Sequence, residues 1–303
     1  MRRAWFVAML AAVTTLGVGV VPATGVVPGG DGLIAFTVIH QAIHGNIALI
    51  QADGTGLIEL PEVEGVSDFA PAWSPDGTRI AYECLTHTDG DNDIWVMDAD
   101  GTNREPVTRN RRSDYNPSWS PDGTMLVFER LMRSGHTPRL WVKVLGGPKP
   151  TRVTNVWSAL PAWSPDGSVI MFTNVYEGPT SWVQDLYTVS PDGTSMTRLT
   201  KTPNLNESFA TWSPDGSHIA FTSVSGSRRY DVYAMEADAT DVVNLTNTPD
   251  QEEGVPAWSP SGAWIAYVIS DEGLWVMASD GSDPVLVIGS FEAAWAPDWQ
   301  AVP

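Results

Sequence analysis

One pentapeptide recurs along this chain at a nearly constant spacing, and it limits the fold more than any other feature. The motif W-S-P-[DS]-G occurs five times, beginning at Trp73, Trp119, Trp163, Trp212 and Trp258. A degenerate sixth copy, W-A-P-D-W, runs from Trp295 to Trp299. Successive tryptophans, counted to Trp295, are 46, 44, 49, 46 and 37 residues apart. A period in this range is typical of repeat proteins in which each unit is one small sheet.

Each unit contains short apolar runs bounded by turn sequences. In the first complete unit, Ile80–Tyr82 follows the S-P-D-G turn, and Ile94–Met97 precedes a second turn at Asp100-Gly101. In S-P-D-G, serine caps the first turn position, proline presets φ at the second, and aspartate and glycine suit the third and fourth. The runs are short, β-branched and aromatic, which predicts strands, and their consecutive apolar residues indicate sheets covered on both faces. Four such strands per unit, repeated radially, form a β-propeller blade.

The two ends of the chain predict how this propeller closes. Asp31–Phe36, Ile47–Ile50 and Leu57–Leu60 correspond to strands two, three and four of a unit that lacks its first strand. Glu292–Pro297 supplies a first strand alone. Pairing the two fragments completes a blade and leaves no free sheet edge. The sequence therefore predicts an all-β, six-bladed propeller with four-stranded antiparallel blades, closed by the C-terminal inner strand.

The repeat also resembles that of a known family. The pattern P-x-W-S-P-D-G-x-x-I-A-[FY], followed by [ILV]-[YW]-x-[MV]-x-x-D-G, is similar to the WD-repeat-like propeller repeats of TolB-type proteins. The resemblance extends from about Gly32 to Gln300, and it implies a propeller whose channel receives protein partners. TolB of Gram-negative bacteria also carries an α/β domain before its propeller, to which no segment of this sequence corresponds. The W-D dipeptide of eukaryotic WD repeats is absent.

The N-terminal segment has the pattern of a secretory leader. Arg2-Arg3 precedes an apolar run that reaches about Val21, and Val21–Ala23 offers small residues for cleavage. We expect residues 1–23 to be a signal peptide, with an uncleaved membrane anchor as the alternative. Residues 24–303 then form one propeller domain, and the location is extracytoplasmic: secreted, periplasmic or in the cell envelope.

Charge and cysteine content restrict the partners. The chain has 36 acidic and 17 basic residues and a formal net charge of −19. Nucleic acids and anionic membrane surfaces require basic patches, so the composition argues against both, apart from a membrane contact through an uncleaved leader. The single cysteine, Cys84, cannot form an intramolecular disulfide and is interpreted as a packing residue. We expect a monomer.

Propeller geometry predicts where a binding site would lie. The S-P-D-G and Asp-Gly turns share one face and are short, whereas the blade connections share the other face and vary, as functional loops do. The innermost strand begins on the varied face, five positions before each tryptophan. The residues at that position are Asp68, Asp114, Ser158, Glu207, Glu253 and Ser290, and Glu292 is close by. Aromatic residues flank them, namely Phe69, Tyr115, Trp157, Phe209 and Phe291.

This arrangement predicts an acidic and aromatic channel mouth. Carboxylates that converge on one opening focus a negative potential there, and aromatic side chains beside them add apolar contact. The prediction is a non-enzymatic interaction module that binds a protein or peptide partner of basic character. The alternative is that the polar residues are solvated strand ends without a binding role.

Metal sites are less well supported by the sequence. Asp89–Asp93 places carboxylates at alternate positions, but the sixth position is Ile94 where a calcium loop needs glycine, which favours an ordinary hairpin loop. Histidines occur in loops of the first three blades, at His40, His44, His87 and His136. Neighbouring blades are too far apart for these to share one ion, although His40 and His44 could do so. We expect no cofactor, with a calcium ion at the channel mouth as the exception left open.

An enzymatic role is the alternative function. Propeller oligopeptidases carry a G-x-S-x-G nucleophile elbow, which is absent here. Propeller lyases use a histidine-rich metal site at the channel. Here no histidine falls on a predicted inner strand, and His218 falls on the second strand of its blade. A metal-assisted carbohydrate lyase or a glycan-binding propeller would have to use arginines to hold a polyanionic sugar. The candidates are Arg111, Arg112, Arg133, Arg228 and Arg229.

Overall fold

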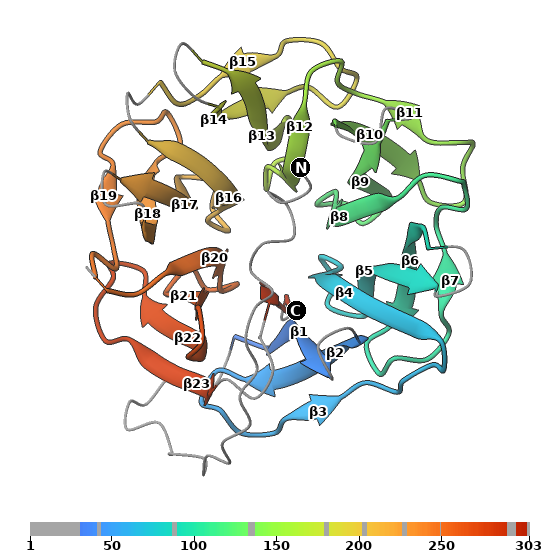
Figure 1. Ribbon diagram of the computed structural model, residues 1–303, viewed down its shortest axis with the longest axis horizontal. Helices are drawn as coiled ribbons and strands as arrows, with labels where there is room; N and C mark the ends of the chain where they lie inside the picture. Colours follow the sequence, from blue (N-terminus) through green and yellow to red (C-terminus); the bar gives the residue numbers. More distant parts are fainter. Residues whose placement is uncertain are drawn as a thin grey trace, which may run out of the picture.

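The computed structural model describes residues 31–40, 44–86, 90–132, 137–178, 182–201, 205–225, 229–248, 250–289 and 295–301. In these ranges every regular element is a β-strand, and the strands form six four-stranded antiparallel sheets around a central axis (Figure 1). The predicted six-bladed propeller is confirmed. The described part of the chain holds no helix long and apolar enough to cross a membrane. The predicted leader, residues 1–23, lies outside the described residues.

The strands of each blade follow one another from the channel to the rim. Blade 1 contains β24 (Trp295–Trp299), β1 (Leu33–His40), β2 (His44–Gln51) and β3 (Ile58–Glu59). Blade 2 contains β4 (Val66–Trp73), β5 (Arg79–Thr86), β6 (Asn92–Asp98) and β7 (Glu105–Pro106). Blade 3 contains β8 (Asp114–Trp119), β9 (Met125–Leu131), β10 (Pro138–Val144) and β11 (Thr151–Arg152).

The second half repeats this order. Blade 4 contains β12 (Ser158–Trp163), β13 (Ile170–Glu177), β14 (Trp182–Val189) and β15 (Thr197–Arg198). Blade 5 contains β16 (Asn206–Trp212), β17 (His218–Ser225), β18 (Arg229–Glu236) and β19 (Val243–Asn244). Blade 6 contains β20 (Glu253–Trp258), β21 (Trp264–Ile269), β22 (Gly273–Ala278) and β23 (Val285–Gly289).

The repeat tryptophan of blade 1 is Trp299, so the predicted alignment on Trp295 is wrong by four residues. β24 pairs with β1 so that Trp299 lies opposite Ile34, the first buried apolar residue of that strand. The Nε1 of Trp299 donates a hydrogen bond of 3.0 Å to the carbonyl of Ala257 in the preceding blade. The equivalent bond of blade 3 joins Trp119 to the carbonyl of Ala72, also at 3.0 Å. A P-x-W triplet ends the inner strand of most blades, and here it is residues 297–299.

Polar contacts fasten the seam between the chain ends, which closes as predicted. The amide of Gln300 donates to the carbonyl of Leu33 at 2.8 Å. The Asp31 carboxylate accepts bonds of 2.9 Å from the amide and the hydroxyl of Ser261 in blade 6. These bonds tie both ends of the described chain to blades 1 and 6.

The core is divided among the interfaces between blades. Six clusters of buried side chains each combine residues from two neighbouring sheets. The cluster between blades 1 and 2 includes Trp73, Tyr82 and Cys84. Cys84 is a buried free thiol, which confirms its interpretation as a packing residue, and burial raises its pKa to about 12.

The S-P-D-G turns have the predicted geometry. In the first, the amide of Gly77 donates to the carbonyl of Ser74 at 2.8 Å, and Gly77 has a φ of 67°, which favours glycine. Asp76 accepts bonds from the hydroxyls of Ser74 and Thr78, which lower the pKa of its carboxyl. The motif therefore has a structural role in the blades that contain it.

Candidate binding face

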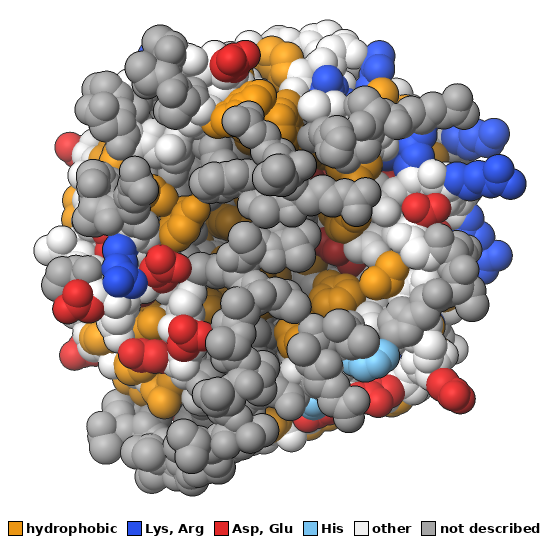
Figure 2. Space-filling view, viewed as in Figure 1, with side chains coloured by type: hydrophobic (Ala, Val, Ile, Leu, Met, Phe, Trp, Pro, Cys, Tyr) orange, Lys and Arg blue, Asp and Glu red, His pale blue; other side chains and the backbone are white. Residues whose placement is uncertain are grey.

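The two faces of the propeller differ as the sequence predicts. The first face carries the S-P-D-G turns and the turns between the third and fourth strands, and we call it the turn face. The opposite face carries the blade connections and the loops between the second and third strands, and we call it the loop face (Figure 2). The turns repeat with the same internal hydrogen bonds, whereas the connections of the loop face differ in length and composition. A binding surface specific to this chain is therefore expected on the loop face.

Asp68 and Asp114 lie at the predicted position of the inner strands, but both are buried and paired with arginine. Asp68 is 4% exposed and forms an ion pair with Arg104. Asp114 is fully buried and accepts two bonds from Arg130, of 2.6 and 2.7 Å. Asn110 donates a further bond of 2.9 Å to Asp114. These two carboxylates are neutralised inside the protein.

The other two acids are also buried. Glu207 is fully buried and lines a cavity of about 290 Å³ together with Leu199, Thr200 and Phe221. Glu253 is 1% exposed and accepts a hydrogen bond from the hydroxyl of Thr248. Burial raises the pKa of Glu207 to about 7 and also raises the pKa of Glu253.

The structure therefore corrects one part of the mouth prediction. The inner-strand acids do occupy equivalent positions, but they do not present an exposed negative ring, because the blades enclose them. The prediction of a basic partner depended on that ring and loses its support. Ser290 is not the equivalent residue of blade 1, because the alignment on Trp295 is wrong. Glu292 and Phe291 lie outside the described residues.

The predicted aromatic residues that the structure describes are half-buried. The ring of Phe69 packs on Gly45 of blade 1, where an added Cβ would lie 2.2 Å from the ring. Trp157 forms an edge-to-face contact with Trp182, with ring centroids 5.6 Å apart. Trp182 is 57% exposed and was not predicted. The two tryptophans form an aromatic pair on the loop face of blade 4.

The other two predicted aromatics belong to the walls of the inner strands. Tyr115 lies on β8, and burial raises the pKa of its hydroxyl. Phe209 lies on β16, where the pairing with β17 shifts register.

Each inner strand has a bulge where the backbone adopts a positive φ. The residues concerned stand three positions before the tryptophan and have φ between 47° and 55°: Ala70, Asn116, Leu160, Phe209, Val255 and Ala296. In L residues this conformation is strained and persists only where the surroundings enforce it. The strand pairing shifts register at the same place in all six blades.

Side chains from the preceding blade hold several of these bulges. The amide of Asn116 donates to Glu83 at 2.8 Å, and the amide of Leu160 donates to Glu129 at 2.6 Å. Thr37 and Thr222 accept the equivalent bonds from Ala70 and Val255 at 3.0 and 2.9 Å. This role was not predicted from the sequence. The available signal was a polar residue inside a buried strand, such as glutamate after Phe128 in L-V-F-E.

The two glutamates are strongly perturbed by their surroundings. Burial raises the pKa of Glu83 to about 8 and that of Glu129 to about 7. Asn116 lies between them, because its amide donates to Glu83 and its side chain donates to Glu129 at 2.6 Å. Asp298 of β24, which accepts a 2.6 Å bond from the amide of Trp73, likewise has a pKa raised by burial to about 7.

The raised pKa values of Glu83, Glu129 and Asp298 predict that the protein is less stable at alkaline than at mildly acidic pH. Their pKa values in the folded protein exceed about 4, the usual value for the unfolded chain. Between about pH 4 and 8 the unfolded chain therefore releases protons that the folded protein retains, so the free energy of unfolding falls as pH rises. We expect the melting temperature to be about 5 °C higher at pH 5 than at pH 8.

Thermal unfolding followed by circular dichroism at both pH values checks this expectation. The double variant Glu83→Gln and Glu129→Gln retains an acceptor oxygen for each backbone amide, so it should fold and show a smaller difference between the two pH values. An equal or higher melting temperature of the parent protein at pH 8 would contradict the burial of these groups.

The described residues provide one cluster with the composition of a metal site. His40, Glu59 and Glu62 place ligand atoms within 4.8 Å of one another. His40 Nε2 is 3.1 Å from Glu59 Oε2, and both side chains are partly exposed. His44 lies opposite His40 in the strand pairing.

Of the segment Asp89–Asp93, the structure describes the residues from Gly90 onward. Asn92 and Asp93 belong to β6. The carboxylate of Asp93 accepts a 3.0 Å bond from Thr108, and the Asn92 side chain donates to Glu83 at 3.3 Å. Asp89 lies outside the described residues, as do His87 and His136.

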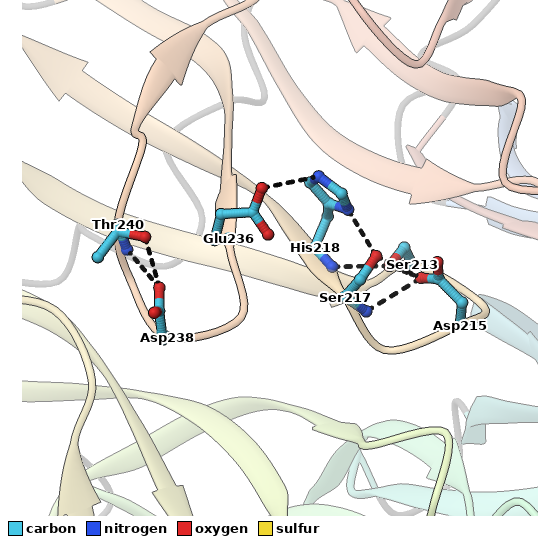
Figure 3. Close-up of polar contacts among 7 residues, drawn as sticks. All are labelled: Ser213, Asp215, Ser217, His218, Glu236, Asp238 and Thr240. Atoms are coloured by element: carbon cyan, nitrogen blue, oxygen red, sulfur yellow. Dashed lines mark hydrogen bonds and ion pairs between the residues drawn. The ribbon is translucent and has the colours of Figure 1, made fainter.

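A serine–histidine–glutamate group on blade 5 lies beside the S-P-D-G turn (Figure 3). Ser217 Oγ lies 2.7 Å from His218 Nδ1, and His218 Nε2 lies 3.3 Å from Glu236. The Ser217 hydroxyl also donates to Asp215 at 2.8 Å, which is the bond that Thr78 makes with Asp76 in blade 2. Ser217 is therefore part of the repeated turn, and His218 and Glu236 are paired beside it at the adjoining ends of β17 and β18, on the turn face.

Fold and site together define a class of protein: a closed β-propeller that presents its variable surface on one face. The chain belongs to the TolB beta propeller domain family (PD40), whose family model matches residues 33–174 and 134–301. The predicted TolB-type resemblance is thus confirmed. No curated protein sequence matches the chain.

Solved structures show the same fold. TolB from Acinetobacter baumannii has a TM-score of 0.75 and 24% identity, covering 89% of this chain and 67% of that one. A putative TolB from Agrobacterium tumefaciens has a TM-score of 0.68 and 20% identity, covering 87% and 91%. An oligogalacturonate lyase from Vibrio parahaemolyticus has a TM-score of 0.57 and 16% identity, covering 80% and 70%. At these identities the similarity concerns the fold alone.

Proposed function

We propose that this protein is an exported, non-enzymatic propeller that binds a segment of a partner protein on its loop face. The observation that carries the proposal is the pair Trp157 and Trp182, which leaves a large aromatic surface exposed on that face. Tryptophan is enriched among the residues that dominate binding energy at protein interfaces. Phe69, Tyr115 and Phe209, half-buried on the inner strands, extend the apolar contact toward the channel. Membership of the TolB propeller family supports the same role.

The inner-strand acids have a supporting role in this proposal. Asp68, Asp114, Glu207 and Glu253 are enclosed by the blades, so they shape the mouth from within and do not contact the partner directly. The partner is bound without a resident metal ion in this proposal, and element analysis of the purified protein tests that point.

A catalytic role has less support. Propeller lyases are among the structures that share the fold, but the only described histidine outside blade 1 is His218, on the turn face. We therefore retain the binding role. The family and the leader-like segment at residues 1–23 support an extracytoplasmic location.

The exposed tryptophan gives the sharpest test. Trp182→Ala should weaken binding of the partner at least tenfold, because a large aromatic anchor is worth about 2 kcal/mol or more when it fills a partner's pocket. The matched control is Met196→Ala, which removes a 46% exposed apolar side chain on the turn face. Titration calorimetry with the partner isolated from the exported fraction measures both variants. Equal affinities for the parent protein and Trp182→Ala would exclude the aromatic pair as the contact.

A further inference from the structure

Basic residues are concentrated in one part of this acidic protein. Residues 104–152 contain ten of the 17 lysines and arginines and only four of the 36 acidic residues. Their formal net charge is +6, whereas the remainder of the chain carries −25. The net charge of −19 therefore conceals a basic region around blade 3.

Two of these arginines are used internally. Arg104 is paired with Asp68, and Arg130 is paired with Asp114 between the rings of Phe128 and Trp141. They balance buried carboxylates and do not contribute to a surface.

Five other arginines lie on the loop-face side of blades 2 and 3. They are Arg109, Arg111 and Arg112 in the connection from β7 to β8, Arg139 at the start of β10, and Arg152 at the end of β11. Lys and Arg side chains gather accordingly along the right and upper right edge of the loop face, over β7 to β11 (Figure 2). We call this set the arginine arc.

The connection that carries three of these arginines is held in place, and two further members of the arc, Arg139 and Arg152, are close enough to interact. Asn110, between Arg109 and Arg111, is bonded to the buried Asp114, which fixes the connection against the inner strand. Burial, together with the nearby charge of Arg152, lowers the pKa of Arg139. Arg109, Arg111 and Arg152 are exposed, and none of the described acidic side chains forms an ion pair with any of the five. A group of like charges that is kept together without counter-charges costs stability, which indicates an external anion.

We propose that the arginine arc binds an acidic segment of the partner protein, next to the aromatic pair. Arg152 ends β11, and Trp157 lies in the connection that follows from β11 to β12, so one extended segment can contact both. Guanidinium groups bind carboxylates in a planar, two-pronged geometry, which suits aspartate and glutamate side chains. The inference rests on the proposed function and adds the charge of the partner, which is opposite to that predicted from the sequence.

The surrounding charge favours a short segment over an extended anionic surface. A membrane or a long polyanionic glycan that reached the arc would also approach the rest of the molecule, which carries −25. The Debye length is about 8 Å at physiological salt, so the repulsion is felt over the neighbouring blades. An acidic peptide confined to blade 3 avoids that repulsion.

A charge-reversal pair tests the proposal. Arg109→Glu with Arg111→Glu reverses two exposed charges in the arc, and Lys149→Glu with Lys201→Glu makes the same change at two exposed positions outside it. The probe is a short fluorescein-labelled poly-glutamate peptide followed by fluorescence anisotropy. We expect the parent and the lysine variant to bind it with affinities within about twofold of each other, and the arginine variant to bind at least tenfold more weakly.

The outcomes separate this inference from the proposed function. If both variants lose affinity for poly-glutamate equally, or if the parent protein does not bind it, the proposal that the arginine arc binds an acidic segment is wrong. Binding to vesicles of anionic phospholipid or to polygalacturonate, but not to poly-glutamate, overturns the choice of a protein segment. If Trp182→Ala no longer binds the isolated partner while the arginine variant still does, the proposed binding on the loop face is supported and the role of the arginine arc is contradicted.

Discussion

A chain that ends at residue 294 is expected not to form a cooperatively folded propeller. The truncation removes β24, so that β1 loses the strand with which it pairs at Ile34, Ala35 and Thr37. It also removes Trp299, which is 5% exposed in the core between blades 1 and 6. An unpaired apolar strand is a template for association between molecules. The expected loss exceeds the total stability of a typical domain, about 5–15 kcal/mol.

The matched control ends at residue 301 and keeps every described residue of the seam. Thermal unfolding and size-exclusion chromatography compare the two chains. The control should behave as the parent protein, and the shorter chain should aggregate or lack a cooperative transition. A soluble monomer with an unchanged melting temperature would show that closure by β24 does not hold the ring together.

The second large effect is expected at Arg130, whose replacement by methionine should reduce the free energy of unfolding by about 3–5 kcal/mol. Arg130 supplies the two bonds to Asp114, which is fully buried. Methionine retains apolar contact with Phe128 and Trp141 but leaves a carboxylate without its counter-charge in the interior. Breaking one half of a buried pair costs more than removing both halves.

The double variant Arg130→Met with Asp114→Asn provides the control. It removes both charges, so we expect it to recover most of the stability that the single variant loses. Lys149→Met, at an exposed position, should change stability by less than about 0.5 kcal/mol. Urea denaturation measures all three variants. A single variant as stable as Lys149→Met would contradict the ion pair.

The number of blades and the closure could be predicted because they depend on turn chemistry that recurs in every unit. S-P-D-G defines the turn locally, and the missing strand at one end matches the extra strand at the other. The alignment of the last copy on Trp295 is wrong because W-A-P-D-W contains two tryptophans, and Trp299 is the one at the repeat position. Pro297 stands two positions before Trp299, as Pro71 stands two positions before Trp73, and this shared spacing identifies Trp299 as the repeat tryptophan.

The site was harder to predict because burial is a tertiary property. The alignment placed Asp68 and Asp114 correctly, yet it could not show that Arg104, from the turn before β7, and Arg130, from β9, reach them. Trp182 lies beside Trp157 only after the blade has folded, since the two are 25 positions apart in the sequence. The arginine arc was hidden by the net charge, although the local excess of arginine from residue 104 onward was visible in the sequence.

The central claim, that a partner protein binds on the loop face around blades 3 and 4, is tested most directly by the hydrogen-exchange footprint of the isolated partner on the intact protein. The account predicts slower exchange in the connection from β7 to β8 and around Trp157 and Trp182, with no change in the S-P-D-G turns. Protection confined to the turn face, with unchanged exchange at Trp157 and Trp182, would contradict it.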